Sequence, residues 1–210
     1  MPAETTEPQL SERFDRALKF ASRLHRRQLR KGTTVPYVSH LLAVAGIALE
    51  HGADEDTAIA ALLHDAVEDQ GGPETLERIR EEFGDRVAGI VAGCSDTDRT
   101  PKPPWRERKE AYVAHLAAER DRAVLLVSAS DKLHNARTIL VDARNLGDAT
   151  WERFAGGKDG SLWYYRSVVS KLRENAAAAG FENLVDELER VVDELFAVAN
   201  GDGQTASSSA

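Results

Sequence analysis

The sequence predicts an all-α protein built as a single helical bundle. Apolar residues recur at helical spacing along most of the chain, and no segment alternates polar and apolar residues as a half-buried strand would. Hydrophobic residues make up 42% of the chain but aromatic residues only 6%, so the core must consist mainly of Ala, Leu and Val. The length of 210 residues suits one domain.

The first half of the chain predicts three longer helices. Ser11 can cap a helix that continues to Leu24, because its hydroxyl can accept an amide hydrogen of the first turn. A second helix is expected at 38–50. Asp54 can cap a third, which is expected to continue through His64 towards residue 70. Glycine and proline interrupt the pattern at 32–36, 51–52 and 71–73.

The second half predicts helices joined by loops rich in proline or glycine. Proline residues mark a loop at 101–104, and a glycine-containing connection is expected at 147–160. Residues 124–127 could form a short strand, but the long helical pattern around them favours a helix. The helices are expected at 74–82, 85–95, 105–119, 123–145, 161–178 and 183–199.

Both ends of the chain differ in composition from its body. Residues 1–8 and 200–210 lack apolar periodicity and are rich in small polar residues, which is typical of disordered tails. Residues 9–199 show no internal repeat and no long linker. We therefore expect one domain at 9–199 between two disordered tails.

Charge, cysteine content and hydropathy exclude several classes of protein. The formal charge of −8 argues against a nucleic-acid binder. A single cysteine, Cys94, rules out an internal disulfide and a multi-cysteine metal site, and it fits a reducing cytoplasm. The longest apolar run, 41–49, is far shorter than the about 20 residues that span a membrane, and the N-terminus lacks the layout of a signal peptide. We expect a cytoplasmic protein without a membrane partner.

Two histidines and two aspartates lie in apolar helical segments, where charged groups are rare unless they are paired or bind metal. They are His40, His64, Asp65 and Asp131. A lone histidine on an apolar face is more often a satisfied core residue. Four such residues together favour a site for a divalent ion such as manganese, iron, cobalt or zinc.

The sequence segments around these residues resemble those of a known family. The order His40, His64-Asp65, Asp131 resembles the pattern of HD-domain metal phosphohydrolases. Over about residues 12–145 the chain is similar to the hydrolase domain of Rel/Spo alarmone proteins. It resembles the stand-alone small hydrolases of that family. The segments that carry this are RRQLRKGTTVPYVSH, ALLHDAVED, FGDRVAGIV and SDKLHNART. The resemblance implies a helical bundle with a manganese site in its centre, or a site for another divalent transition metal.

The resemblance also implies an activity. It predicts removal of pyrophosphate from the 3′ position of guanosine tetra- and pentaphosphate, the alarmones of the stringent response. His40, His64, Asp65 and Asp131 would hold the metal. Glu68 and Asp69 would position and activate the attacking water, and on one continuous helix they would lie on faces neighbouring His64 and Asp65. By themselves, Glu68 and Asp69 could equally be the polar end of a helix.

The nucleotide would be a small-molecule substrate bound by two further segments. Arg30 and Lys31 match an arginine–lysine pair that holds base and phosphates in the family, whereas the cations just before them could form a solvated helix face. Tyr37 is a second contact or a packing residue. The resemblance adds Asn135, Arg137 and Thr138 to the substrate contacts and leaves His134 a supporting role.

Other readings remain at this point. Tyr164 and its neighbours could stack on a base but favour a core role, while Lys158 and Arg166 are candidate phosphate contacts. The same chemistry could act on another nucleotide, such as the 2′-phosphate of NADPH. The chain could also be a nucleotide-binding module that has lost catalysis, although all six metal and water positions are present.

Overall fold

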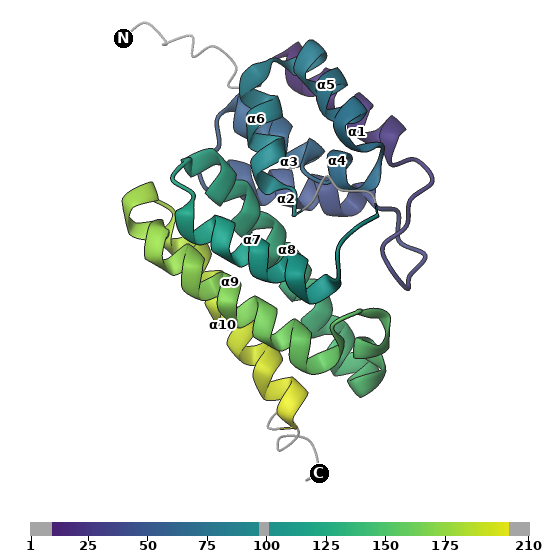
Figure 1. The fold of residues 1–210 in the computed structure, drawn as a ribbon, viewed down its shortest axis with the longest axis vertical. Helices are drawn as coiled ribbons and strands as arrows, with labels where there is room; N and C mark the ends of the chain where they lie inside the picture. Colours follow the sequence, from purple (N-terminus) through teal and green to yellow (C-terminus); the bar gives the residue numbers. More distant parts are fainter. Residues whose placement is uncertain (1–9, 97–100, 202–210) are drawn as a thin grey trace, which may run out of the picture.

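The computed structural model describes residues 10–96 and 101–201, and these form the predicted all-α fold (Figure 1). Within these ranges, the extended pairing is limited to one antiparallel bridge between Leu29 and Pro36. The helices are α1 (Glu12–Leu24), α2 (Val38–Glu50), α3 (Glu55–Leu63), α4 (Ala66–Asp69), α5 (Gly72–Phe83), α6 (Asp85–Cys94), α7 (Trp105–Ala118), α8 (Arg122–Leu146), the 3-10 helix η1 (Gly147–Arg153), α9 (Gly157–Ala179) and α10 (Glu182–Asn200).

Side-chain caps begin three of these helices. The Ser11 hydroxyl accepts the amide of Arg13 at 3.2 Å, and a carboxylate oxygen of Asp54 accepts the amide of Thr57 at 2.8 Å. Asp121 accepts the amide of Ala123 at 2.9 Å and so begins α8. Each cap satisfies an amide that the first turn leaves without a helical partner.

Helix α8 is the central element of the fold. It packs against α2, α3 and α6 from the N-terminal half and against η1, α9 and α10 from the C-terminal half (Figure 1). Its middle turns are fully buried, including Leu126, Val127 and Leu133. A polar side chain on these turns is therefore removed from bulk water unless it faces a cavity. None of the helices in the described part of the chain is long and apolar enough to cross a membrane.

The expectation of one continuous helix through His64 is wrong. Helix α3 ends at Leu63 and α4 begins at Ala66, with a turn at His64 and Asp65. The imidazole Nδ1 of His64 bonds the carbonyl of Ala61 at 2.8 Å. A continuing helix would use that carbonyl for the amide of Asp65, so the ring competes with the helical hydrogen bond.

Smaller differences occur towards the C-terminus. Helix α9 begins at Gly157, four residues before the expected start, and part of the connection at 147–160 forms η1. Residues 124–127 are helical, as favoured. Asn200, assigned to the tail, is the last residue of α10. The expected tails at 1–8 and beyond residue 201 lie outside the described residues.

Candidate metal centre and its cavity

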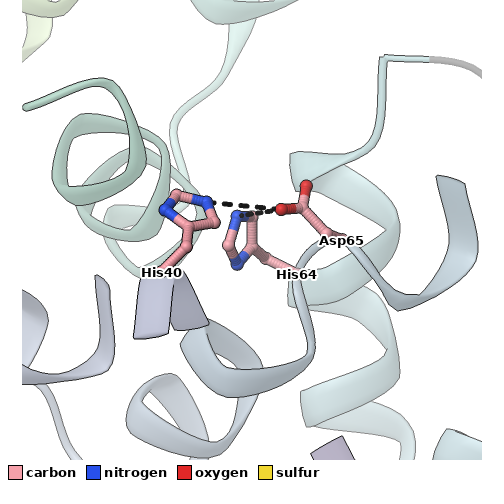
Figure 2. A group of neighbouring side chains, drawn as sticks. All are labelled: His40, His64 and Asp65. Atoms are coloured by element: carbon pink, nitrogen blue, oxygen red, sulfur yellow. Dashed lines mark ion pairs between the residues drawn. The ribbon is translucent and has the colours of Figure 1, made fainter. Parts of the chain in front are cut away.

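Three separate segments bring the four predicted ligands together. His40 comes from α2, His64 and Asp65 from the turn between α3 and α4, and Asp131 from the buried middle of α8. Figure 2 shows the rings of His40 and His64 directed towards the carboxylate of Asp65. Asp65 Oδ2 lies 3.4 Å from His40 Nε2 and 3.0 Å from His64 Nε2. Asp131 Oδ1 lies 3.2 Å and 3.7 Å from the same two nitrogens.

The hydrogen bonds of both imidazoles suit metal ligands. His64 Nδ1 donates to the Ala61 carbonyl, and His40 Nδ1 lies 2.8 Å from His134 Nδ1. Both Nε2 atoms are buried and make no hydrogen bond within the described residues. A ligating histidine commonly uses one nitrogen for such an outer bond and offers the other to the ion.

The spacing also fits a shared ion, since ligand atoms of His40, His64 and Asp65 all lie within 4.8 Å of one another and Asp131 approaches both histidines. Donors that each lie about 2.1 Å from one ion at right angles are about 3 Å apart. The nitrogen–oxygen separations here run from 3.0 to 3.7 Å. Two imidazoles and two carboxylates are a donor set that transition metals accept. The residues present therefore fit a divalent cation.

Strong electrostatic coupling accompanies this arrangement. Burial by itself would lower the pKa of His64, but the carboxylates of Asp65 and Asp131 raise it well above its ordinary value. Burial would likewise raise the pKa of Asp65, but His64 and His40 hold it well below its usual range. Burial also lowers the pKa of His134 to about 4, with help from His40. The neutral His134 can accept a hydrogen bond from His40 Nδ1, which leaves the Nε2 lone pair of His40 for an ion.

A cavity of about 930 Å³ lies beside the four donors, none of which lines it. The donors are beneath its wall, and residues that touch them form the wall. The Tyr37 hydroxyl donates to Asp65 Oδ2 at 2.6 Å, and Asn135 Nδ2 donates to Asp131 Oδ1 at 2.5 Å. All eight predicted catalytic and substrate residues line this cavity: Arg30, Lys31, Tyr37, Glu68, Asp69, Asn135, Arg137 and Thr138.

One corner of the cavity is built by the short hairpin after α1. The amide of Arg30 donates to the Val35 carbonyl at 2.8 Å, and Gly32 has a φ of +73° at its tip. The Arg30 guanidinium lies 5.6 Å from the Tyr37 ring centre and donates to Asn135 Oδ1 at 2.6 Å. Thus the two predicted nucleotide segments, although far apart in sequence, share one wall.

Helix α4 contributes Glu68 and Asp69 to the cavity wall. Lys102 Nζ lies 3.0 Å from Glu68, and Gln28 donates to Asp69 at 2.8 Å. Burial raises the pKa of Glu68, and the carboxylate of Asp96 raises it further. Asp96 itself is almost fully buried and binds Arg108 and Lys109. A raised pKa makes a glutamate a better proton acceptor than a glutamate of ordinary pKa, provided that it is ionised.

Several cavity residues were missed from the sequence. Cations outnumber carboxylates on the cavity wall. The cations that were not predicted are Arg108, Lys109, Lys132 and Arg153. Lys132 Nζ binds Oδ2 of Asp131 and lies 5.0 Å from the ring centre of Tyr112. Its place directly after Asp131 was the available signal. The cluster of cations at 102–109 was another.

The aromatic and basic residues at 158–166 have different roles in the structure. Tyr164 and Tyr165 are buried core residues that also form part of the cavity wall. Lys158 pairs with Asp148 and Arg166 with Asp193, and neither lines the cavity. In the described structure, these two cations therefore have structural partners instead of the predicted phosphate contacts.

An all-α domain in which two histidines and two aspartates gather beside a cation-rich cavity has the architecture of a metal-dependent hydrolase. The sequence profile of the HD domain matches residues 17–156, and the chain belongs to that family. Structural comparison agrees. A metazoan orthologue of SpoT, described as hydrolysing ppGpp, is 31% identical with a TM-score of 0.69, and the match covers 89% of this chain and 97% of that one. A Listeria monocytogenes protein is 30% identical with a TM-score of 0.66, over 78% of this chain and 99% of that one.

Curated relatives are much longer proteins. The guanosine-3′,5′-bis(diphosphate) 3′-pyrophosphohydrolase of Aquifex aeolicus is 42% identical over 135 residues, which are 64% of this chain and 19% of the relative. The bifunctional (p)ppGpp synthase/hydrolase SpoT of Escherichia coli is 32% identical over 175 residues, which are 79% and 23%. The chain thus spans about one fifth of the length of these relatives.

Proposed function

We propose that this protein hydrolyses guanosine 3′,5′-bis(diphosphate) to GDP and pyrophosphate, and the pentaphosphate to GTP and pyrophosphate. One observation carries the proposal: four metal-type donors lie beside a cation-rich cavity, and Tyr37, Lys132 and Asn135 on its wall contact them. A substrate with two diphosphate groups needs such a wall. The names of the similar proteins support the same substrate.

His40, His64, Asp65 and Asp131 would hold a divalent ion, with Mn²⁺ as the proposed metal. Such an ion, when bound, would polarise a phosphate and lower the pKa of water. The chain keeps these donors ready through the bonds of His64 to Ala61 and of Tyr37 to Asp65. Because the ligand side chains are pre-oriented, little reorganisation is needed on binding.

The chain's own acid–base groups then handle the proton. Water adds to the phosphorus attached to the ribose O3′, the bond from that phosphorus to O3′ breaks, and O3′ takes up a proton. Glu68, with its raised pKa, accepts the proton of the attacking water, while Asp69 orients that water. Lys102 and Arg108 lie beside Glu68, 3.0 Å and 3.6 Å away, and would offset the charge of the diphosphate that the water attacks.

Nucleoside recognition would fall to the part of the cavity wall formed by the hairpin after α1 and by α8. The Arg30 guanidinium offers a planar surface to the guanine base, and its bond to Asn135 holds it in place. Lys31, Tyr37, Arg137 and Thr138 complete the proposed substrate contacts. Such an enzyme would act on the cytoplasmic nucleotide pool.

A turnover assay on the full chain tests this function. The metal-stripped protein is incubated with Mn²⁺ and either guanosine tetraphosphate or NADPH. We expect equal amounts of GDP and pyrophosphate from the first and no orthophosphate from the second. Absence of GDP and pyrophosphate would overturn the proposal, and release of orthophosphate from NADPH alone would assign the cavity to a 2′-phosphate.

A further inference from the structure

A second hollow lies outside the metal-centre cavity, between α1 and α5 on the N-terminal half. Its volume is about 410 Å³, and none of its lining residues lines the larger cavity. Figure 1 shows α1 and α5 side by side at the edge of the molecule. We call this hollow the α1–α5 groove, and its lining residues are Arg16, Lys19, Phe20, Arg23, Leu24, Arg78 and Glu82.

The groove is strongly positive in a protein that is negative as a whole. Arg16, Lys19 and Arg23 follow one another at spacings of three and four residues, so they project from one face of α1. Arg78 adds a fourth cation from α5, against the single carboxylate of Glu82. The formal charge of the chain is −8, so this concentration is a local feature.

Several arginines of the chain are held by carboxylates, whereas others within the described residues, such as Arg26 and Arg122, form no ion pair. Arg13, on the same helix, binds Glu55 and Asp56, and Arg173 on α9 binds two acids. Among residues 10–96 and 101–201, none of the four groove cations forms an ion pair with a carboxylate. Four cations that share one hollow repel one another. An anionic ligand would relieve that repulsion.

The floor of the groove is aromatic and held in place. The Phe20 ring packs edge-on against the buried Phe83 ring, with ring centres 5.7 Å apart. The Arg78 guanidinium lies 5.1 Å from the centre of the Phe20 ring. A guanidinium plane beside a phenyl ring is a surface on which a planar base can stack.

From these features we propose that the α1–α5 groove is a second binding site, for a nucleoside di- or triphosphate. The volume lies within the range of small-molecule sites. The four cations match the charge of an oligophosphate, and the Phe20–Arg78 floor matches a base. The overall negative charge disfavours a long polyanion as the occupant.

The position of the groove gives such binding a route to the metal centre. The last turn of α1 leads within six residues to Arg30 of the cavity hairpin, and α5 directly follows the segment that carries Glu68 and Asp69. Arg13 also donates to the carbonyl of Phe83 at 2.9 Å, which ties the start of α1 to the end of α5. A ligand that bridges α1 and α5 therefore contacts two helices that are joined along the chain to segments of the larger cavity's wall, although neither helix lines that cavity itself.

The test measures GDP binding to the full chain by calorimetry without metal. A background variant, Arg30→Glu with Lys31→Glu, removes binding in the larger cavity, so the outcome does not depend on the proposed hydrolysis. We expect this background to bind one GDP per chain. Adding Arg16→Glu and Arg23→Glu should weaken that binding at least tenfold. The matched charge change Lys171→Glu with Arg190→Glu, on α9 and α10, should alter it less than twofold.

Defined results would overturn the proposal. They are no binding of GDP by the background variant, or equal weakening by the groove and control changes. Pyrophosphate serves as a second probe and should bind at least tenfold more weakly than GDP; equal binding would refute the contact with a base. If the charge reversals reduce helical circular dichroism, the milder pair Lys19→Gln and Arg23→Gln replaces them, with at least threefold weakening expected and unchanged binding contradicting the site.

Discussion

The Tyr37 hydroxyl donates a 2.6 Å hydrogen bond to Oδ2 of Asp65, the carboxylate oxygen that faces both His40 and His64. Tyr37 is itself held between two groups. The His25 ring stacks on it with ring centres 5.3 Å apart, and the Arg30 guanidinium lies 5.6 Å from its ring centre. This tyrosine therefore links Arg30, on the cavity wall, to the candidate metal ligands.

Tyr37→Phe should weaken Mn²⁺ binding about 10- to 100-fold, the usual effect of removing an outer hydrogen bond from a metal ligand. Competition with a fluorescent chelator measures this affinity. Tyr164→Phe is the matched control, because the buried Tyr164 hydroxyl has no hydrogen-bond partner within the described residues. Equal metal affinities for the Tyr37 variant and the wild type would refute the role of this bond.

Asp96→Asn should shift the acidic side of the kcat/KM profile to lower pH. Burial and the Asp96 carboxylate raise the pKa of Glu68, and a proton acceptor must be ionised to act. Removing the negative charge of Asp96 lowers the Glu68 pKa, so more of Glu68 is ionised at a given acidic pH. The exposed change Asp148→Asn should leave the profile in place. A shift to higher pH, or no shift, would contradict the coupling of Glu68 to Asp96.

Lys132→Met should destabilise the metal-free protein by about 3 kcal/mol, since it leaves the buried Asp131 carboxylate without its cation. The loss should shrink when Mn²⁺ is added, because the ion supplies positive charge to the same carboxylate. Urea unfolding with and without Mn²⁺ measures both values. The surface change Lys171→Met should cost less than about 1 kcal/mol. Equal losses for the two lysines would show that Lys132 does not balance Asp131.

Gly156→Ala should destabilise the fold by about 1–3 kcal/mol. An added Cβ would lie 2.5 Å from the indole of Trp105, the residue that begins α7 and lines the cavity. Gly46→Ala in α2 meets no atom within 4 Å and should stabilise by about 0.5–1 kcal/mol. Thermal unfolding of both variants checks the contrast. Stabilisation by Gly156→Ala would mean that Trp105 is free to move aside.

The fold could be predicted wherever local signals agreed. Helix α2 begins and ends at the expected residues, 38 and 50, because proline and glycine bound an apolar segment. The break at His64 and Asp65 could not be predicted, since it depends on which carbonyl the His64 ring bonds. The start of α9 at Gly157 was not predicted either, because a pair of glycines ordinarily indicates a loop.

The site shows the same division. Residues near the ligand motifs, such as Arg30 and Asn135, lie on the cavity wall, and their contact with a substrate stays a prediction. Lys158 and Arg166 were offered as phosphate contacts, but tertiary packing pairs them with Asp148 and Asp193. Ion pairs between distant segments leave no periodic signal in a sequence. The same limit explains why Arg153 was missed.

The proposed function requires that His40, His64, Asp65 and Asp131 hold the ion needed for hydrolysis at the 3′ position. A ³¹P NMR time course of guanosine tetraphosphate with Mn²⁺ tests it most directly, comparing wild type with Asp65→Asn at equal helical content. We expect equimolar pyrophosphate and GDP from the wild type and at least a 100-fold slower reaction from the variant. No pyrophosphate from the wild type, or equal rates from the two proteins, would contradict it.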